Sequence, residues 1–182
     1  MIKKIKQTKS EKILIIFISL LAIFSFIFVF SIKNKCLFIK NNDPSKIIFE
    51  NHNNIVILNA ECGNVIIELY PDISPNTVKR FKELIKEKKY DQVAFHRVIK
   101  NTLVQGGDLE FGRKNNLNYT YLGTGSSGLG LLNTEISRTF NFTKGTIGFA
   151  RTNKKNTEDS QFFILLVDAP LFNEEYTPVG KV

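Results

Sequence analysis

The chain has 182 residues, 43% of them hydrophobic, and a formal net charge of +8. This length has room for one globular domain and an extension. Residues 1–46 carry nine Lys and two acidic residues, whereas residues 47–182 have a net charge of only +1. Because the positive charge lies in the N-terminal part, the composition argues against a nucleic-acid-binding domain, and we expect no nucleic-acid partner.

The cysteines and histidines are too few to build a disulfide framework or a metal centre. Cys36 and Cys62 are the two cysteines, and the sequence leaves open whether they form one bridge or two free thiols. His52 and His96 have no Cys or His partner at the spacing of zinc ligands. We therefore expect neither a metal ion nor another cofactor.

The first feature along the chain is an uncharged apolar run at residues 13–32, behind a basic tail at residues 1–12. Twenty such residues are about the length of a helix that crosses a membrane. A cleaved signal peptide is the alternative, but its apolar stretch is usually shorter, roughly 7–15 residues, and ends at a small-residue cleavage site. The run therefore predicts a single-pass membrane anchor.

The residues around this run indicate its orientation. Five lysines precede the run and four follow it closely, which slightly favours a cytoplasmic N-terminus. Two glycosylation sequons, at residues 118–120 and 141–143, agree with a domain on the lumenal side. We expect a lumenal domain in the endomembrane system, joined to the anchor by an Asn- and Lys-rich linker at residues 33–53.

The rest of the chain, residues 54–182, is predicted to be one mainly β domain. Two β-rich runs at residues 55–58 and 65–69 flank a turn at residues 61–64 and predict a hairpin. Many short strands around few helices predict a closed or nearly closed antiparallel barrel. The further strands are expected at residues 93–99, 103–105, 146–150, 162–167 and 178–182.

One helix is predicted directly after the hairpin. Ser74 is a good N-cap residue, and Pro75 suits the first helical turn. Val78, Phe81 and Ile85 follow at helical spacing and predict the apolar face of this helix. A helix with one apolar face is expected to cap the barrel.

Three short motifs carry the most specific signal: Phe-His-Arg-Val-Ile at 95–99, Gln-Gly-Gly-Asp at 105–108 and Ser-Gln-Phe-Phe-Ile at 160–164. Their order and spacing resemble the cyclophilins, which catalyse cis/trans isomerisation of peptidyl-prolyl bonds. The resemblance covers residues 54–182 and implies an eight-stranded antiparallel barrel capped by two helices. Cyclophilins continue past this point with a helix and a last strand, so either a fragment or a truncated fold is expected.

Peptide-bond rotation has a barrier of about 18–20 kcal/mol, because amide resonance must be broken. A catalyst needs only a donor that favours the twisted amide and a pocket for the proline ring. The resemblance implies that Arg97 is this catalytic donor and that Gln105 positions it and contacts the substrate. An Arg suits this role, because it stays charged and its planar fork holds direction. No proton is transferred, so His96 is expected to be a packed, hydrogen-bonded residue and not a general base.

The resemblance also implies a substrate-binding pocket, which departs from the family pattern. Thr102 stands where cyclophilins usually have Phe, Leu171 where Trp is common, and Tyr176 where the pocket wall has His. Losing a buried ring costs about 1–2 kcal/mol at about 25 cal/mol per Å², so a weakened site is expected and cyclosporin binding is in doubt. The implied substrate-binding residues are Thr102, Leu103, Ala150, Arg151, Phe163, Leu171 and Tyr176.

A glycine-rich run at residues 123–128 matches the pattern G-x-G-x-x-G. A dinucleotide-binding loop must open a helix within a βαβ unit. Here more glycine follows and no helix start is present, so nucleotide binding is not expected. The resemblance places a glycine-rich loop of cyclophilins at this position, beside the substrate groove.

Two functions follow from these observations. The first is a membrane-tethered peptidyl-prolyl isomerase, expected to be a monomer, that assists protein folding and acts on proline-containing polypeptides. The second is a binding module of the same fold that grips proline-containing segments of a partner with little turnover. Arg97, Gln105 and Phe163 favour the enzyme, whereas Thr102 and Leu171 favour the binding module.

Overall fold

The structure is a computed structural model that describes residues 8–33, 47–49 and 51–182. The chain divides into two compact units: most of the sheet belongs to the unit of Pro44–Leu58 and Val65–Val182, whereas the N-terminal helix and the hairpin end at Asn59–Asn64 belong to the other. Cys36, most of the predicted linker and most of the basic tail lie outside the described residues. The predicted domain boundaries remain predictions.

The N-terminal helix α1 spans Lys9–Lys33. Thr8 and Glu11 start it with a reciprocal capping box, in which the Thr8 N–H donates to Glu11 Oε2 at 2.8 Å and the Glu11 N–H donates to Thr8 Oγ1 at 3.3 Å. This box begins the helix one turn before the predicted start at residue 13. Its 23-residue stretch Lys9–Ser31 has the length and apolar composition of a membrane span or a signal sequence.

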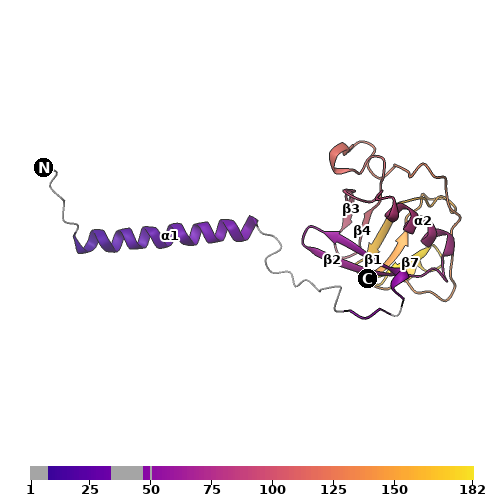
Figure 1. The fold of residues 1–182 in the computed structure, drawn as a ribbon, viewed down its shortest axis with the longest axis horizontal. Helices are drawn as coiled ribbons and strands as arrows, with labels where there is room; N and C mark the ends of the chain where they lie inside the picture. The colour runs from indigo at the N-terminus through magenta and orange to yellow at the C-terminus, as the bar shows by residue number, and fades with distance from the viewer. Residues whose placement is uncertain (1–7, 34–46, 50) are drawn as a thin grey trace. The chain divides into compact units, whose positions relative to one another are not determined.

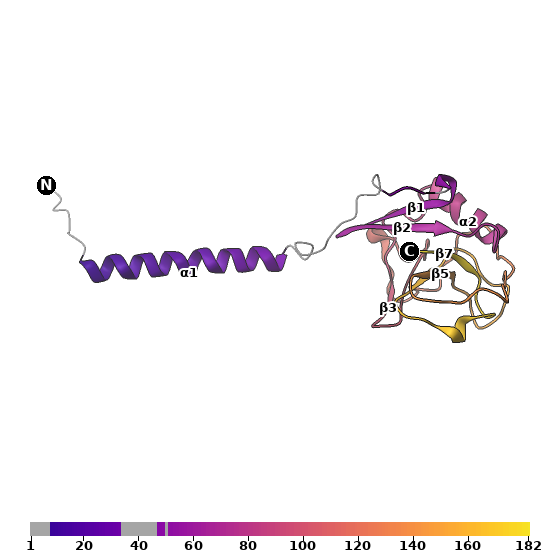
Figure 2. The ribbon, with the colours of Figure 1, turned by 90° about the horizontal axis from the view of Figure 1, so that it is seen from below.

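The larger unit is built on one antiparallel sheet of seven strands, which curls into an open half-barrel (Figures 1 and 2). The strand order is β1-β2-β7-β5-β6-β4-β3, so β1 and β3 are the edge strands of the described sheet. The strands are β1 (Ile55–Ala60), β2 (Gly63–Leu69), β3 (Arg97–Ile99), β4 (Leu103–Gly106), β5 (Thr146–Phe149), β6 (Phe162–Leu165) and β7 (Pro178–Lys181).

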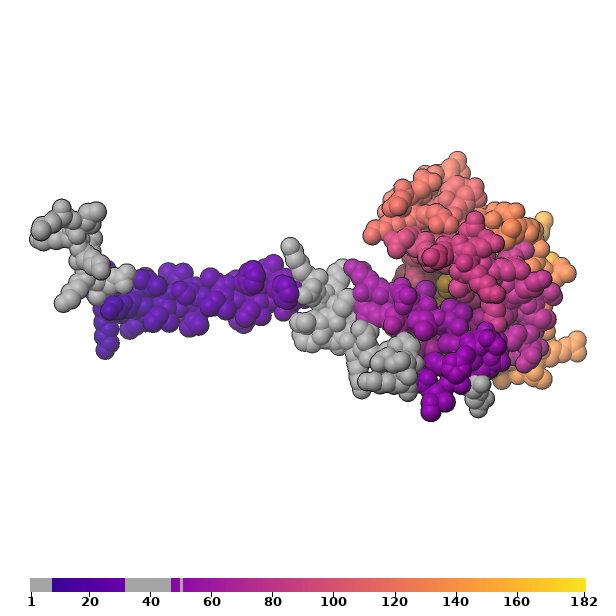
Figure 3. Space-filling view, viewed as in Figure 1, coloured from indigo at the N-terminus to yellow at the C-terminus, as the bar shows by residue number. Residues whose placement is uncertain are grey.

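The predicted hairpin and strands are confirmed, but two strands are clearly shorter than expected, and the strand predicted at residues 162–167 ends at Leu165. The strand expected at residues 93–99 is limited to Arg97–Ile99, because its first residues pair elsewhere. Val93 forms an isolated bridge with Arg113, and the Ala94 N–H donates to the Gly112 carbonyl at 2.8 Å. The long loop after β4, which contains the short 3₁₀ helix η3 (Lys114–Asn116), is thereby joined to the chain before β3, and it projects from the domain (Figures 1 and 3).

Helix α2 spans Pro75–Lys86, where it was predicted. Ser74 occupies the N-cap position, as predicted, but its hydroxyl bonds outside the helix and donates to the Pro178 carbonyl at 2.5 Å. Glu135, from a distant loop, caps the helix instead. Its carboxylate accepts the backbone N–H groups of Asn76 at 3.1 Å and Thr77 at 2.9 Å, which satisfies free donors at the helix start.

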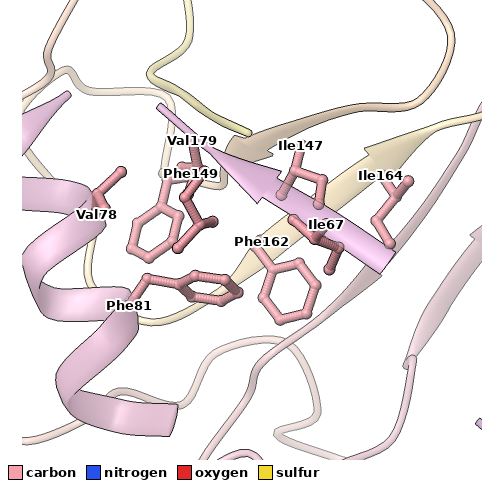
Figure 4. Packing of buried hydrophobic residues seen from close by; sticks show 9 residues of the cluster. Ile67, Val78, Phe81, Ile147, Phe149, Phe162, Ile164 and Val179 are labelled. Carbon is pink, nitrogen blue, oxygen red and sulfur yellow. The ribbon is translucent and has the colours of Figure 1, made fainter. Parts of the chain in front are cut away.

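The main core lies between α2 and one face of the sheet. Figure 4 shows the rings of Phe81, Phe149 and Phe162 turned toward one another there. The Phe81 centroid is 5.9 Å from that of Phe149 and 5.3 Å from that of Phe162, both in edge-to-face arrangements, a favoured geometry for aromatic pairs. The buried members of this cluster are Ile67, Leu69, Val78, Phe81, Ile147, Phe149, Phe162, Ile164 and Val179.

A second, smaller cluster covers the other face of β6. Phe163 and Leu165 belong to it, whereas their neighbours Phe162 and Ile164 belong to the main core. This alternation follows from the two-residue period of a β-strand. Because both faces of β6 are covered, all four of its residues are buried, and the strand has a continuous apolar sequence.

Candidate active site

Three neighbouring strands bring the three sequence motifs together. Arg97 on β3 lies opposite Gln105 on β4, and Gln105 lies opposite Phe163 on β6. Residues opposite one another in adjacent strands project from the same face of a sheet. The register therefore places a cation, an amide and an aromatic ring side by side on the face away from the main core.

A chain of side-chain hydrogen bonds runs across this face. Arg97 Nη1 donates to Gln105 Oε1 at 3.3 Å, and Gln105 Nε2 donates to Gln161 Oε1 at 3.1 Å. Gln161 Nε2 in turn donates to the carbonyls of Gly123 and Gly125, each at 3.0 Å. Gln105 is the one hydrogen-bond partner of the Arg97 side chain within the described part of the chain, so most guanidinium N–H groups of Arg97 remain available to a ligand.

A pocket of about 250 Å³ opens beside Arg97 and Gln105. Phe163 is 3% exposed and forms its floor. The ring centroid of Phe163 is 5.4 Å from that of Phe172 and 5.3 Å from that of Tyr176, both nearly perpendicular. The lining residues are Arg97, Ile99, Thr102, Leu103, Gln105, Ala150, Arg151, Phe163, Phe172 and Tyr176.

A glycine makes room for the floor of this pocket. Gly148 lies on β5 opposite Phe163. A Cβ atom at Gly148 would lie 2.4 Å from Phe163 Cζ and 3.0 Å from Phe142 Cε1, well inside van der Waals contact. The Phe163 ring therefore lies directly over the β5 backbone, which explains a glycine in the interior of this strand.

Of the predicted site residues, Leu171 alone does not line this pocket. It lies in the 3₁₀ helix η4 (Pro170–Phe172) with its side chain 89% exposed. The next residue, Phe172, turns inward, and its ring is 4.8 Å from that of Tyr176. The sequence prediction did not include Phe172, because an irregular loop has no periodicity that would mark it as a lining residue.

A second pocket, of about 410 Å³, adjoins the first, and the two share Gln105, Ala150 and Arg151 as lining residues. Its other walls come from the glycine-rich loop and from the segments around residues 157–161. The loop is irregular and does not open a helix.

The glycine-rich loop is held by an acidic residue of the chain itself. Asp108 Oδ2 accepts the backbone N–H groups of Gly123 at 2.7 Å and Gly125 at 3.2 Å. Burial raises the pKa of Asp108, but these bonds and two from Glu110 and Phe111 outweigh it, so the pKa of this carboxyl lies below its ordinary value. Amide groups that would face a phosphate in a nucleotide-binding loop are thus already bonded to a carboxylate.

His96 is packed behind this loop. Both of its ring nitrogens are buried, and neither has a hydrogen-bond partner among the described residues, so the expected hydrogen bonds are not found. Burial lowers the pKa of His96, while the nearby Asp108 carboxylate acts in the opposite direction. Ala94 and Gln161 lie near the ring and also favour its protonated form, but neither forms a hydrogen bond of good geometry with it.

The comparisons with known proteins identify the family. The family model for the cyclophilin type peptidyl-prolyl cis-trans isomerase/CLD domain matches residues 55–182. The chain belongs to this family. A probable peptidyl-prolyl cis-trans isomerase of Brucella suis is 43% identical over 130 residues, which are 71% of this chain and 66% of that protein. The chain thus spans just under two thirds of the length of this cyclophilin relative.

Other cyclophilins agree with this assignment. The peptidyl-prolyl cis-trans isomerase-like 1 of Rhizopus delemar is 36% identical, over 70% of this chain and 72% of that protein. A Cryptosporidium parvum cyclophilin solved in the presence of the dipeptide Ala-Pro has a TM-score of 0.57 and 30% identity, covering 65% of this chain and 72% of that one. The cyclophilin AquaCyp293 of Hirschia baltica, at 22% identity and a TM-score of 0.58 over 71% and 63% of the two chains, shares the fold.

Proposed function

We propose that the domain is a peptidyl-prolyl cis/trans isomerase and that Arg97 is its catalytic residue. The observation that carries this proposal is the position of a guanidinium with few hydrogen bonds in a pocket that Phe163 floors. A proline ring that packs on Phe163 presents its amide bond to Arg97. The reaction makes and breaks no covalent bond, so these two elements are sufficient for the chemistry.

The guanidinium acts on the amide as it twists. Rotation breaks the resonance of the peptide bond, and the prolyl nitrogen recovers its lone pair. A charged donor directed at this nitrogen or at the preceding carbonyl oxygen stabilises the twisted state more than either planar state. Gln105 holds the guanidinium by its 3.3 Å bond to Nη1, and Gln161 holds Gln105, so the donor is oriented before the substrate arrives.

Proline-containing polypeptides are the proposed substrates. A Cryptosporidium parvum cyclophilin of 30% identity was solved in the presence of Ala-Pro, a dipeptide of the kind that this pocket suits. With the proline ring on Phe163, the chain before it passes Gln105 and Ala150 toward the second pocket, which these residues also line. The other substrate-binding residues proposed are Thr102, Leu103, Arg151 and Tyr176, with Phe172 in place of the exposed Leu171.

We also propose that α1 anchors the domain to a membrane as a single span, with the N-terminus cytoplasmic and a monomeric domain in the lumen, where it assists protein folding. The apolar stretch Lys9–Ser31 supports the span, and the lysine distribution supports the orientation. Resistance to carbonate extraction and protection of residues 47–182 from protease in sealed vesicles are the expected results. A soluble mature protein without residues 9–31 would instead identify a cleaved signal sequence.

A binding module with little turnover is the second candidate function. Thr102 supports it, since a small polar side chain lines the pocket where cyclophilins usually have Phe. NMR exchange spectroscopy on a short Ala-Pro-Phe peptide, with the full chain in detergent micelles, separates the two candidates. Faster cis/trans exchange than in buffer is expected for the isomerase. Peptide binding without faster exchange would establish the binding module in its place.

A further inference from the structure

We propose that Arg151 is a positioning residue of the pocket, which fixes the ring of Tyr176 as the wall against which the proline packs, and that Glu175 holds Arg151 in this role. The inference rests on the proposed isomerase function and deepens it. It assigns different tasks to the two arginines that line the pocket: Arg97 acts on the reacting bond, and Arg151 shapes the binding surface.

The hydrogen bonds of Arg151 already engage all three of its guanidinium nitrogens. Nη2 forms an ion pair with Glu175 Oε2 at 2.9 Å, Nε donates to the Glu175 carbonyl at 3.1 Å, and Nη1 donates to the Thr152 carbonyl at 3.0 Å. The Arg151 side chain is only 9% exposed. By contrast, Arg97 is exposed, and its side chain has a single hydrogen-bond partner among the described residues, Gln105. A guanidinium bonded on every nitrogen is poorly suited to follow a twisting amide, but well suited to hold its neighbours in place.

The neighbour that Arg151 holds is Tyr176. The guanidinium carbon of Arg151 lies 4.8 Å from the centroid of the Tyr176 ring, within the range of a cation–π contact. On its other sides this ring packs on Phe172 and Phe163. Tyr176 follows η4 in a loop, where these side-chain contacts and one backbone hydrogen bond, from its N–H to the Phe172 carbonyl at 3.2 Å, hold it.

Glu175 ties the arrangement together. One oxygen of its carboxylate pairs with Arg151, and the other pairs with Lys155 at 3.5 Å. Glu175 and Tyr176 are consecutive residues. The Arg151–Glu175 ion pair and the Arg151–Tyr176 cation–π contact therefore hold the same short loop. Loss of either contact frees the wall of the pocket while the floor at Phe163, held by the strands, stays in place.

The test is the separation of binding from turnover. Arg151→Lys keeps the charge but loses the planar fork, so the Kd and KM for an Ala-Pro-Phe peptide are expected to rise about three- to tenfold while kcat changes less than about twofold. Glu175→Gln is expected to move the same quantities in the same direction by a smaller factor.

Arg113→Lys is the matched control. Arg113 makes three side-chain hydrogen bonds to backbone carbonyls, of Leu109, Asp91 and Lys89, and it lines neither pocket. Thermal melting of both Arg→Lys variants measures any general loss of stability. A rise in Kd for Arg151→Lys at unchanged Kd for Arg113→Lys supports the proposal.

Three results would overturn it. A tenfold fall in kcat for Arg151→Lys at unchanged affinity would make Arg151 a catalytic residue. An equal loss of affinity in Arg113→Lys would attribute the effect to general destabilisation. Wild-type affinity in both Arg151→Lys and Glu175→Gln, with the wild-type enzyme active, would show that the position of the Tyr176 ring does not depend on Arg151 and Glu175. If the wild type neither binds the peptide nor accelerates its exchange, the proposed function itself fails.

Discussion

The two faces of strand β6 are covered in different ways, although they alternate residue by residue along one strand. Phe162 faces a core that helix α2 closes, in which rings fill the space between α2 and the sheet. Phe163 faces a cluster closed by the η4 loop, which leaves a pocket of about 250 Å³. Helix α2 and its side chains fill the space over the Phe162 face, whereas the irregular η4 loop leaves a pocket over the Phe163 face.

This difference separates stability from binding. The core face contributes mainly to the free energy of folding, because its buried apolar residues pack directly against α2. The pocket face also buries Phe163, but it leaves a pocket beside this ring, with Arg97 and Gln105 among the lining residues. Substitutions on the two faces are therefore expected to have different consequences even when the chemical change is the same.

Phe162→Ala and Phe163→Ala test this difference between the two faces most directly. Phe162→Ala leaves a cavity in the closed core and is expected to lower the free energy of unfolding by about 3–5 kcal/mol. Phe163→Ala opens onto the pocket, which water can enter, so its loss of stability is expected to be smaller while peptide binding is abolished. Urea unfolding and peptide titration measure the two effects. Equal losses of stability and of binding in both variants would remove the distinction between the faces.

Gly148→Ala tests how closely the pocket floor lies against β5. A Cβ atom there would be 2.4 Å from Phe163 Cζ, so the ring must move. Overpacking of this kind is expected to cost about 1–3 kcal/mol and to weaken peptide binding. Gly128→Ala is a useful contrast, because a Cβ there would meet no atom within 4 Å, although its positive φ of 77° adds local strain. Unchanged binding in Gly148→Ala would contradict the placement of Phe163.

Thr102→Phe sharpens the comparison from the pocket side. The added ring is expected to supply the missing aromatic wall and to raise kcat/KM several-fold, equivalent to about 1–2 kcal/mol of apolar contact. Stability should change little, since Thr102 is half-buried in the β3–β4 turn. The measurement is exchange spectroscopy with the same peptide. A fall in kcat/KM would mean that the added ring occupies space that the substrate needs.

The smallest expected effect is the contribution of His96 to the pH dependence of the free energy of unfolding. Burial lowers the pKa of His96 below its ordinary value of 6.5, so folding favours the neutral ring. The stability that this provides is complete above about pH 6.5 and is lost as the pH falls through the folded-state pKa. Urea unfolding at pH 7.5 and 5.5 should show a loss in the wild type that His96→Gln reduces. An identical loss in both proteins would assign the pH dependence to other groups.

The elements and the central site residues could be predicted because their signals are local. Alternation and turn residues mark the strands, and the motifs at residues 95–99, 105–108 and 160–164 carry Arg97, Gln105 and Phe163. The cap of α2 could not be predicted, because Glu135 lies 59 residues from Asn76 in the sequence and no local pattern links them. The choice of Phe172 over Leu171 as a lining residue depends on the turn of an irregular loop, which has no periodicity to read. The contacts of Arg151 with Glu175 and Tyr176 involve the same loop and could not be predicted for the same reason.

The central claim is that Arg97 stabilises the twisted amide, and Arg97→Ala tests it most directly. The cis/trans exchange rate of an Ala-Pro-Phe peptide, measured by NMR at saturating and subsaturating concentrations, gives kcat and KM for the wild type and the variant. The account predicts a fall in kcat of about ten- to a thousandfold, or about 1.4–4 kcal/mol of barrier. The fold should stay intact, because the side chain is exposed at the edge of the sheet. An active wild type whose kcat is unchanged in a folded Arg97→Ala variant would contradict the account.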